Sequence, residues 1–247
     1  MIKKDLINLD LINSSLKDNG YVKVKNFFTE ETINEICDFT VSEIKKINKD
    51  RFSLNETQLE NTIINKILNE PDLKFFCEDL DEKNIIENID FNPHYLIHYK
   101  RKKNKSDEKF SFHYDAFVYT IIIPINIHNE NENNFAMSLE LIPNYRNLTN
   151  SMILNIFQKL IIQNKLFKFF SNSFLFKFFF KTKNIKIDFS EILIFNGFRS
   201  LHSHSISKAH VEKEKARLII HVFNPFHDNK INQLIFENIQ KKRVIKN

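Results

Sequence analysis

The sequence predicts a mainly β protein in which helices pack on the outside of a sandwich or jelly roll (α+β class). Three observations support this prediction. Helical periodicity dominates residues 1–90, whereas short stretches of strand-like alternation follow over residues 91–228. The chain has 247 residues, is 42% hydrophobic and contains 26 Phe, so it can bury about 70–75% of its unfolded surface. We therefore expect a single domain, residues 1–247.

The N-terminal 90 residues predict one strand and two helical regions. A turn at residues 19–20 precedes alternating residues 21–25, which are typical of a short strand. Thr29 is a suitable N-cap for a helix that follows, because two glutamates occupy the first turn, where the helix dipole favours them. A second helical region is expected at residues 57–88, with an interruption at Pro71.

Short strands are expected through the core at residues 91–228, and a helix in the tail, residues 229–247. The expected strand segments are residues 94–100, 110–126, 135–143, 185–206 and 215–226.

The segment at residues 144–183 differs from the strands around it. Its apolar positions recur at helical spacing with Lys and Gln between them, which predicts a helical, Phe-rich insert. The lysines interrupt it too often for it to cross a bilayer. Three roles are open for this insert: a lid over a functional site, an interfacial contact with a membrane, or a dimer surface. An insert that simply packs on the jelly roll is an equally good interpretation.

Composition narrows the setting. The formal net charge of +5 and the pI of about 9.0 are compatible with an anionic substrate but do not call for nucleic acid. A basic run at residues 100–105 would suit phosphate groups of a substrate, or it is a solvated loop. Cys37 and Cys77 lack metal-ligand spacing, and the first residues do not resemble a signal peptide, so we expect a cytoplasmic protein. With only two glycines, the chain has no glycine-rich phosphate loop.

Histidine and aspartate stand two residues apart in "FHYDAF". On a strand, His113 and Asp115 point to the same side, so an imidazole and a carboxylate converge. The pair is either half of a metal site or a structural ion pair. A second imidazole is available from a distant strand-like segment, as His202 or His204 in "GFRSLHSHSI". Two imidazoles and one carboxylate form the ligand set of non-haem iron sites.

Arg217 opens the apolar stretch "RLIIHVF", fifteen residues beyond His202. A guanidinium at the end of a buried strand requires an anionic partner, and its planar fork can hold a carboxylate through two hydrogen bonds. The partner is either a dicarboxylate ligand or an acid of the chain such as Glu191.

The His-x-Asp pair, the distal histidine and the arginine follow one another along the chain. In this order they resemble the motifs of the Fe(II)/2-oxoglutarate-dependent oxygenases, most closely those of the phytanoyl-CoA dioxygenase-like branch. "DNGYVKVKNFFTEETINEI" is similar to the opening strand and helix of that branch, and "FHYDAF" to its His-x-Asp strand. "IFNGFRSLHS" resembles its distal-histidine strand and "KARLIIHVF" its arginine strand.

The resemblance implies a double-stranded β-helix of the jelly-roll, cupin-like type that uses Fe(II), 2-oxoglutarate and O2. It implies that His113, Asp115 and His202 bind the metal as catalytic residues. Arg217 would clamp 2-oxoglutarate, and Tyr99 and Thr120 would help to seat it. The implied reaction is hydroxylation of a small or carrier-linked molecule, anionic or lipid-like in character, with release of succinate and CO2.

Two other functions remain open. One is a non-catalytic jelly-roll module whose Phe-rich insert binds a membrane or a partner. The other is a cupin-type metal enzyme that does not use 2-oxoglutarate. The remaining histidines are expected to be structural or surface residues: His94, His98, His128, His210, His221 and His227.

Overall fold

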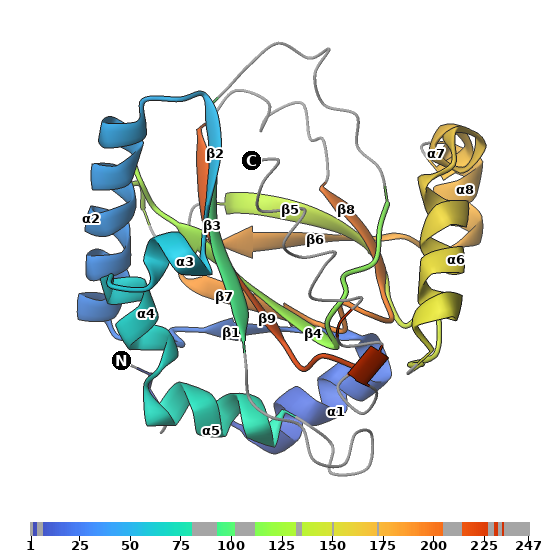
Figure 1. Ribbon diagram of the computed structural model, residues 1–247, viewed down its shortest axis with the longest axis horizontal. Coiled ribbons are helices and arrows are strands. Elements are labelled where there is room, and N and C mark those ends of the chain that lie inside the picture. Colours follow the sequence, from blue (N-terminus) through green and yellow to red (C-terminus); the bar gives the residue numbers. More distant parts are fainter. Residues whose placement is uncertain are drawn as a thin grey trace.

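Apolar side chains that recur at every second residue allow a strand to bury one face in a sheet. Strand β9 (Lys215–Val222) buries every second side chain, and β3 (His94–Lys100) matches the predicted segment residue for residue. In the computed structural model such strands form two antiparallel sheets (Figure 1). The structure describes residues 2–3, 7–80, 93–101, 112–131, 135–149, 151–171, 173–204, 214–226, 230–231 and 234.

The larger sheet has six strands in the order β1-β7-β4-β9-β3-β2. Its members not yet given are β1 (Tyr21–Lys25), β2 (Arg51–Asn55), β4 (Tyr119–Ile125) and β7 (Glu191–Phe195). The smaller sheet has the order β6-β5-β8, formed by β6 (Lys183–Asp188), β5 (Phe135–Ile142) and β8 (Leu201–His204). The architecture is the predicted jelly roll with flanking helices.

The two faces of the larger sheet bury different cores. Ile121 and Leu218 point outward into a core that also contains Ile36 of the helical layer. Ile122 points inward and packs with Leu139 of the smaller sheet. Each strand of the larger sheet therefore has an outer side against helices and an inner side between the sheets. Successive residues of a strand lie on opposite sides, so neighbouring candidate residues can be separated by the sheet.

Five helices precede or interrupt the first strands and cover the outer core. They are α1 (Leu9–Asn19), α2 (Glu30–Ile47), α3 (Glu56–Leu59), α4 (Ile63–Leu68) and α5 (Pro71–Asp79). Thr29 caps α2 as predicted, by accepting a hydrogen bond from the backbone N–H of Thr32. The sequence pattern did not predict α1, which begins after the N-cap Asn8 and ends at Gly20, whose φ of 74° favours glycine. Residues 81–88 of the second expected helical region lie outside the described residues.

The prediction of one continuous strand over residues 110–126 is wrong. His113 forms an antiparallel bridge with His202 of the smaller sheet, whereas β4 begins in the larger sheet at Tyr119. The chain bends at residues 116–118 because it must leave one sheet before it can pair in the other. The sequence pattern also missed β2. Of the expected helical tail, the structure describes only residues 230, 231 and 234, all of them helical.

The predicted insert consists of three helices at one side of the sheets (Figure 1). They are α6 (Met152–Gln163), α7 (Lys165–Ser171) and α8 (Phe174–Phe179). Ile162 and Phe176 attach the insert to the jelly roll, where they pack with Phe112, Tyr114 and Leu201. Within the described part of the chain, no helix is both long and apolar enough to cross a membrane.

Candidate metal centre

Three ligand-type side chains meet where the smaller sheet is extended by the segment before β4. His113, Asp115 and His202 each offer a ligand atom, and these atoms lie within 4.8 Å of one another. The backbone sets the distance between the two imidazoles. The N–H of His113 donates to the carbonyl of His202 over 2.9 Å, and the N–H of His202 donates back over 3.0 Å.

The ring of His202 is oriented so that one nitrogen contacts the backbone and the other faces the cluster. Its Nδ1 lies 3.2 Å from the carbonyl oxygen of Ser200, which can only accept, so Nδ1 carries the proton. The other ring nitrogen, Nε2, faces the cluster and lies 3.5 Å from Asp115 Oδ2. His202 is only 4% exposed, whereas His113 is exposed. The cluster is therefore closed on the His202 side and accessible on the His113 side.

Asp115 is ionised and firmly positioned. Burial alone would raise its pKa, but His202, through charge and a hydrogen bond, together with His221 and His113, holds the pKa of this carboxyl well below its usual range. The hydroxyl of Thr120 donates to Oδ2 of Asp115 over 2.5 Å. Because an ionised carboxylate only accepts, the hydroxyl proton must point at Asp115. The Nδ1 of His221, 3.0 Å from the same hydroxyl, must then donate to it. His221, Thr120 and Asp115 form one directed chain of hydrogen bonds.

Gly197, one of the two glycines, allows the carboxylate to approach the β7–β8 turn. Its carbonyl accepts the backbone N–H of Asp115 over 3.0 Å. A Cβ at this position would lie 2.9 Å from Asp115 Oδ2 and closer still to Thr120 Oγ1. Glycine is therefore required here by close packing, since any side chain would displace the ligand or its hydrogen-bond donor.

Arg217 lies on the inner side of the larger sheet, directly paired with His98 of β3 and Pro124 of β4. Burial first, and the charge of Arg51 second, lower the pKa of Arg217 to about 10. Burial and the charges of Arg217, Arg51 and Lys100 lower the pKa of His98 to about 3, so this imidazole is neutral at neutral pH. Burial is the main cause of both shifts, and the neighbouring cations add to it, so an anion at this end of the sheet would be attracted.

The structure brings some of the sequence-predicted residues together and separates others. His113, Asp115 and His202 form one cluster, and Thr120 contacts its carboxylate. Tyr99 lies apart: it pairs with Ala216 in register and belongs to the outer core, on the opposite face of the sheet from His98.

Other expectations concern the neighbours of these residues. Glu191, an alternative partner for Arg217, lies 2.8 Å from Lys23 instead. The side chain of His204 and residues 102–105 of the basic run lie outside what the structure describes.

Sequence reasoning missed two residues near the site, His98 and His221, which it grouped with the structural histidines. The signal for His221 was present, because it follows Arg217 by four residues on the same strand and must share its face. His98 could not be found in this way, because only the pairing of β3 with β9 places it beside Arg217.

The donor set fits a metal ion of the non-haem iron type. Two imidazoles and one ionised carboxylate converge there. Fold and site together define a jelly-roll protein with a candidate two-histidine, one-carboxylate metal centre.

No protein-family model and no curated protein matches the sequence. Solved structures do match its fold. The non-haem α-ketoglutarate-dependent epimerase SnoN from nogalamycin biosynthesis superposes with a TM-score of 0.55 at 10% identity, over 87% of this chain and 82% of SnoN. SnoN in complex with Fe3+, α-ketoglutarate and nogalamycin RO gives a TM-score of 0.53 at 9% identity, over 87% and 83%. EvdMO1 gives 0.57 at 12% identity, over 88% of this chain and 50% of that one. At such identities the likeness shows the jelly-roll fold.

Proposed function

We propose that this protein is an Fe(II)/2-oxoglutarate-dependent oxygenase that hydroxylates a small or carrier-linked molecule. The observation that carries the proposal is the cluster of His113, Asp115 and His202, whose ligand atoms lie within 4.8 Å of one another. It occurs in a jelly roll similar to that of SnoN, which is α-ketoglutarate dependent and was solved with Fe3+ and that compound.

In this proposal the three side chains would hold Fe(II) and leave coordination positions for other ligands. When bound, Fe(II) and 2-oxoglutarate would supply oxidation by O2, coupled to decarboxylation of 2-oxoglutarate to succinate and CO2. The chain of His221 and Thr120 keeps the carboxylate of Asp115 ionised and aimed at the metal. The contact of Nδ1 with the carbonyl of Ser200 orients the ring so that Nε2 of His202 faces Asp115.

Arg217 is the proposed clamp for the far carboxylate of 2-oxoglutarate. Its guanidinium lies in a region where Arg51 and Lys100 add positive charge and His98 stays neutral. A dicarboxylate would therefore find both a fork for two hydrogen bonds and a favourable potential. Thr120 is assigned to the carboxylate ligand instead of the co-substrate, and Tyr99, on the outer face, is given no part in binding it.

The finer assignment, to the phytanoyl-CoA dioxygenase-like branch, rests on the order of the sequence motifs and on the residues in them. Hydroxylation is proposed over halogenation because Asp115 occupies the position that a halide ligand would need on such a metal.

The test is an anaerobic titration with Fe(II) and 2-oxoglutarate, in which the chelate should give a visible metal-to-ligand absorption band. His202→Ala should abolish the band, and His204→Ala is the matched control that should retain it. Screening candidate substrates for succinate formation, and for products that gain one oxygen atom, would then identify the reaction. No band in the wild type would contradict the proposal and favour the non-catalytic module. A metal-binding protein indifferent to 2-oxoglutarate would favour the cupin-type enzyme.

A further inference from the structure

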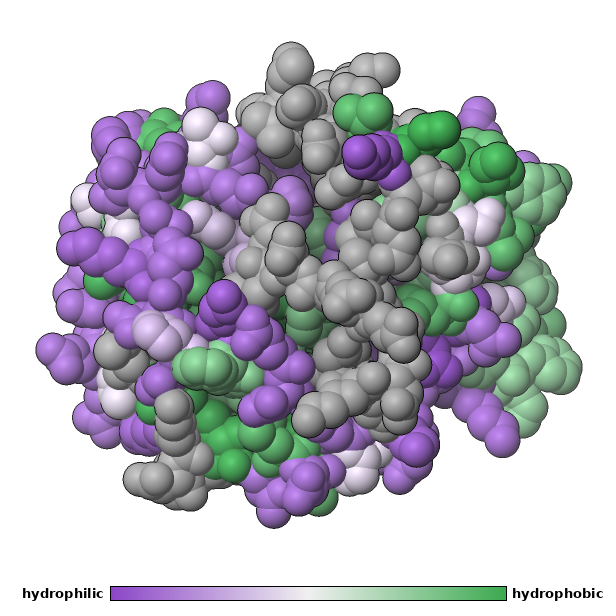
Figure 2. Space-filling view, turned by 60° about the horizontal axis from the view of Figure 1, so that its bottom comes forward, coloured by the Kyte–Doolittle hydropathy of each residue, from purple (hydrophilic) through white to green (hydrophobic). Residues whose placement is uncertain are grey.

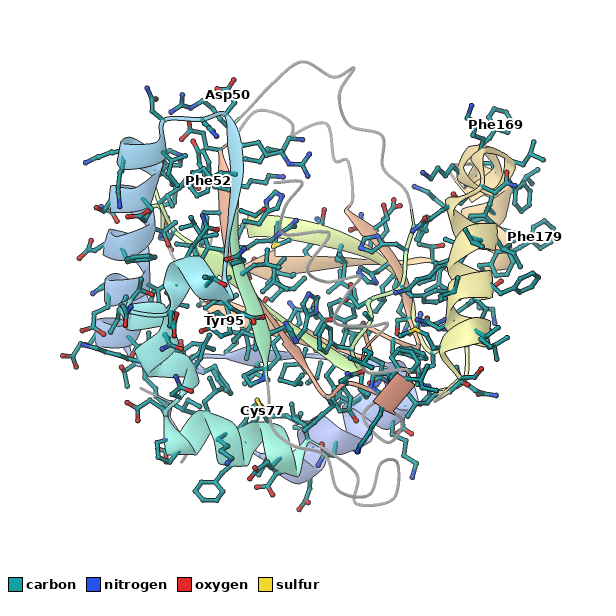
Figure 3. The ribbon with its side chains drawn as sticks, viewed as in Figure 1. Asp50, Phe52, Cys77, Tyr95, Phe169 and Phe179 are labelled. Carbon is teal, nitrogen blue, oxygen red and sulfur yellow. The ribbon has the colours of Figure 1, made fainter. Side chains whose placement is uncertain are left out.

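The three helices of the insert expose an unusual concentration of large apolar side chains. In the described part of the chain eighteen such side chains are exposed, and thirteen of them lie in α6–α8. The thirteen, called here the apolar surface, are Ile153, Leu154, Ile156, Phe157, Leu160, Ile161, Leu166, Phe169, Phe170, Phe174, Leu175, Phe178 and Phe179. Figure 2 shows hydrophobic side chains along the edge of the molecule that these helices form. Phe169 and Phe179 point away from the sheets (Figure 3).

Most of the apolar side chains of α6 point outward. Its buried residues are Met152, Asn155 and Ile162, so an amide faces the protein. Ile153 (83% exposed), Phe157 and Leu160, spaced as one helical face, point to solvent. A helix that only covered a jelly roll would turn its apolar stripe inward. Contiguous exposed apolar surface of this kind marks an interaction site.

The charge of the same segment is one-sided. Residues 151–182 contain five lysines and no acidic residue: Lys159, Lys165, Lys168, Lys177 and Lys181. Their formal charge of +5 equals that of the whole chain, so the remaining residues sum to zero (5 − 5). Lys177 pairs with Glu140 of β5. The segment and this acid together still carry a formal charge of +4 (5 − 1) beside the apolar surface.

We propose that α6–α8 dock on an anionic lipid surface, with the apolar side chains in the interfacial layer and the lysines at the headgroups. Apolar and aromatic side chains flanked by lysine, on helices too short to span a bilayer, are the pattern of interfacial membrane binding. Negative headgroups would attract the net positive charge of this segment.

A second copy of the chain is a poorer occupant. In a two-fold contact the same segment faces itself, so lysines would oppose lysines, and Glu140, the acid nearest in sequence before the segment, already pairs with Lys177. A lipid surface avoids this conflict.

The experiment is co-sedimentation of the full chain with vesicles of phosphatidylcholine alone or mixed with phosphatidylserine. The wild type should bind the mixed vesicles, and the bound fraction should fall with added salt. Phe169→Ser combined with Phe179→Ser should weaken binding at least about 10-fold, since two side chains lose their apolar contact with lipid. The matched control is Phe75→Ser, an exposed phenylalanine (60%) on α5, which should bind like the wild type.

Charge is tested separately, with Lys165→Glu and Lys181→Glu together, which should weaken binding to the mixed vesicles. Lys45→Glu with Lys49→Glu, on and beside α2, is the control and should not. Equal binding to both kinds of vesicle would overturn the inference of an anionic surface. No vesicle binding, with concentration-dependent dimers that the Phe169 and Phe179 substitutions abolish, would show a copy-to-copy interface instead. The readout is independent of turnover, so it stands or falls apart from the proposed oxygenase activity.

Discussion

Thr120→Val should weaken metal binding while leaving the fold intact. The threonine hydroxyl donates to Asp115 over 2.5 Å and accepts from His221 at 3.0 Å. Valine fills nearly the same volume without a hydroxyl, so the carboxylate loses its donor and the His221 N–H its acceptor. A hydrogen bond to a charged group contributes about 1.5–3 kcal/mol. If that stabilisation serves to hold the ligand in place, metal affinity should fall about 10- to 100-fold.

The assay is calorimetric titration of the two proteins with Fe(II) under anaerobic conditions, or with Co(II) as a stable substitute. Thr40→Val is the matched control, because Thr40 is also fully buried and its hydroxyl donates to the carbonyl of Ile36 within α2. The control should lose some stability and keep its metal affinity. Unchanged affinity in Thr120→Val, or an equal loss in Thr40→Val, would refute the positioning role.

Three further perturbations address the rest of the site. Arg217→Ala should weaken 2-oxoglutarate binding about 100-fold, or about 2.7 kcal/mol, while metal affinity is retained. Arg217→Lys should recover only part of the lost affinity, because an ammonium cannot form the two hydrogen bonds of the guanidinium. If calorimetry finds wild-type affinity for 2-oxoglutarate in Arg217→Ala, the arginine has a structural role instead. Gly197→Ala should cost about 1–3 kcal/mol by overpacking and also weaken metal binding, and denaturant melts with wild-type midpoints would contradict this. The pKa of His98 is lowered from 6.5 to about 3, so only the unfolded chain takes up this proton as pH falls below 6.5. Stability should therefore fall by about 1–2 kcal/mol between pH 7 and pH 5, and His98→Gln should remove that part of the slope in urea unfolding curves.

Local sequence signals were sufficient to predict where some elements begin. Strand β3 and helix α2 begin where the sequence predicts, because an alternating stripe and an N-cap are local signals. The clustering of His113 and Asp115 was predictable for the same reason, since residues i and i+2 of extended chain share a side. The approach of His202 was not a local signal. It came from a resemblance between motifs far apart in the chain, and the antiparallel bridge gives its structural basis.

Sequence reasoning missed two things: which residues of a strand face the inner side of the sheet, and which strands pair with one another. Tyr99 and His98 are neighbours on β3, and only the pairing with β9 decides which of them shares the inner face with Arg217. Thr120 was expected near the co-substrate, yet its contacts depend on Asp115, which reaches it after the bend at residues 116–118. No pattern within one segment encodes how two strands meet after such a change of sheet.

Arg146, a residue that no motif singled out, contributes to the outward orientation of α6. Its buried guanidinium lies 4.0 Å from the ring centre of Tyr114 and 3.9 Å from that of Phe198, and its Nε donates to the carbonyl of Phe198. The remaining guanidinium nitrogens donate to side-chain oxygens of Asn155 and Gln158 on α6. An arginine that is buried must have such acceptors, so Asn155 and Gln158 face the protein and most of the apolar side chains of α6 are left outside.

Periodicity alone predicts a stripe but not its direction, because the direction depends on long-range contacts such as those of Arg146. Arg146 also ties the insert to both halves of the candidate site, since Tyr114 stands between His113 and Asp115, and Phe198 follows Gly197. The surface proposed to meet the lipid and the side chains proposed to hold the metal are thus supported by the same guanidinium.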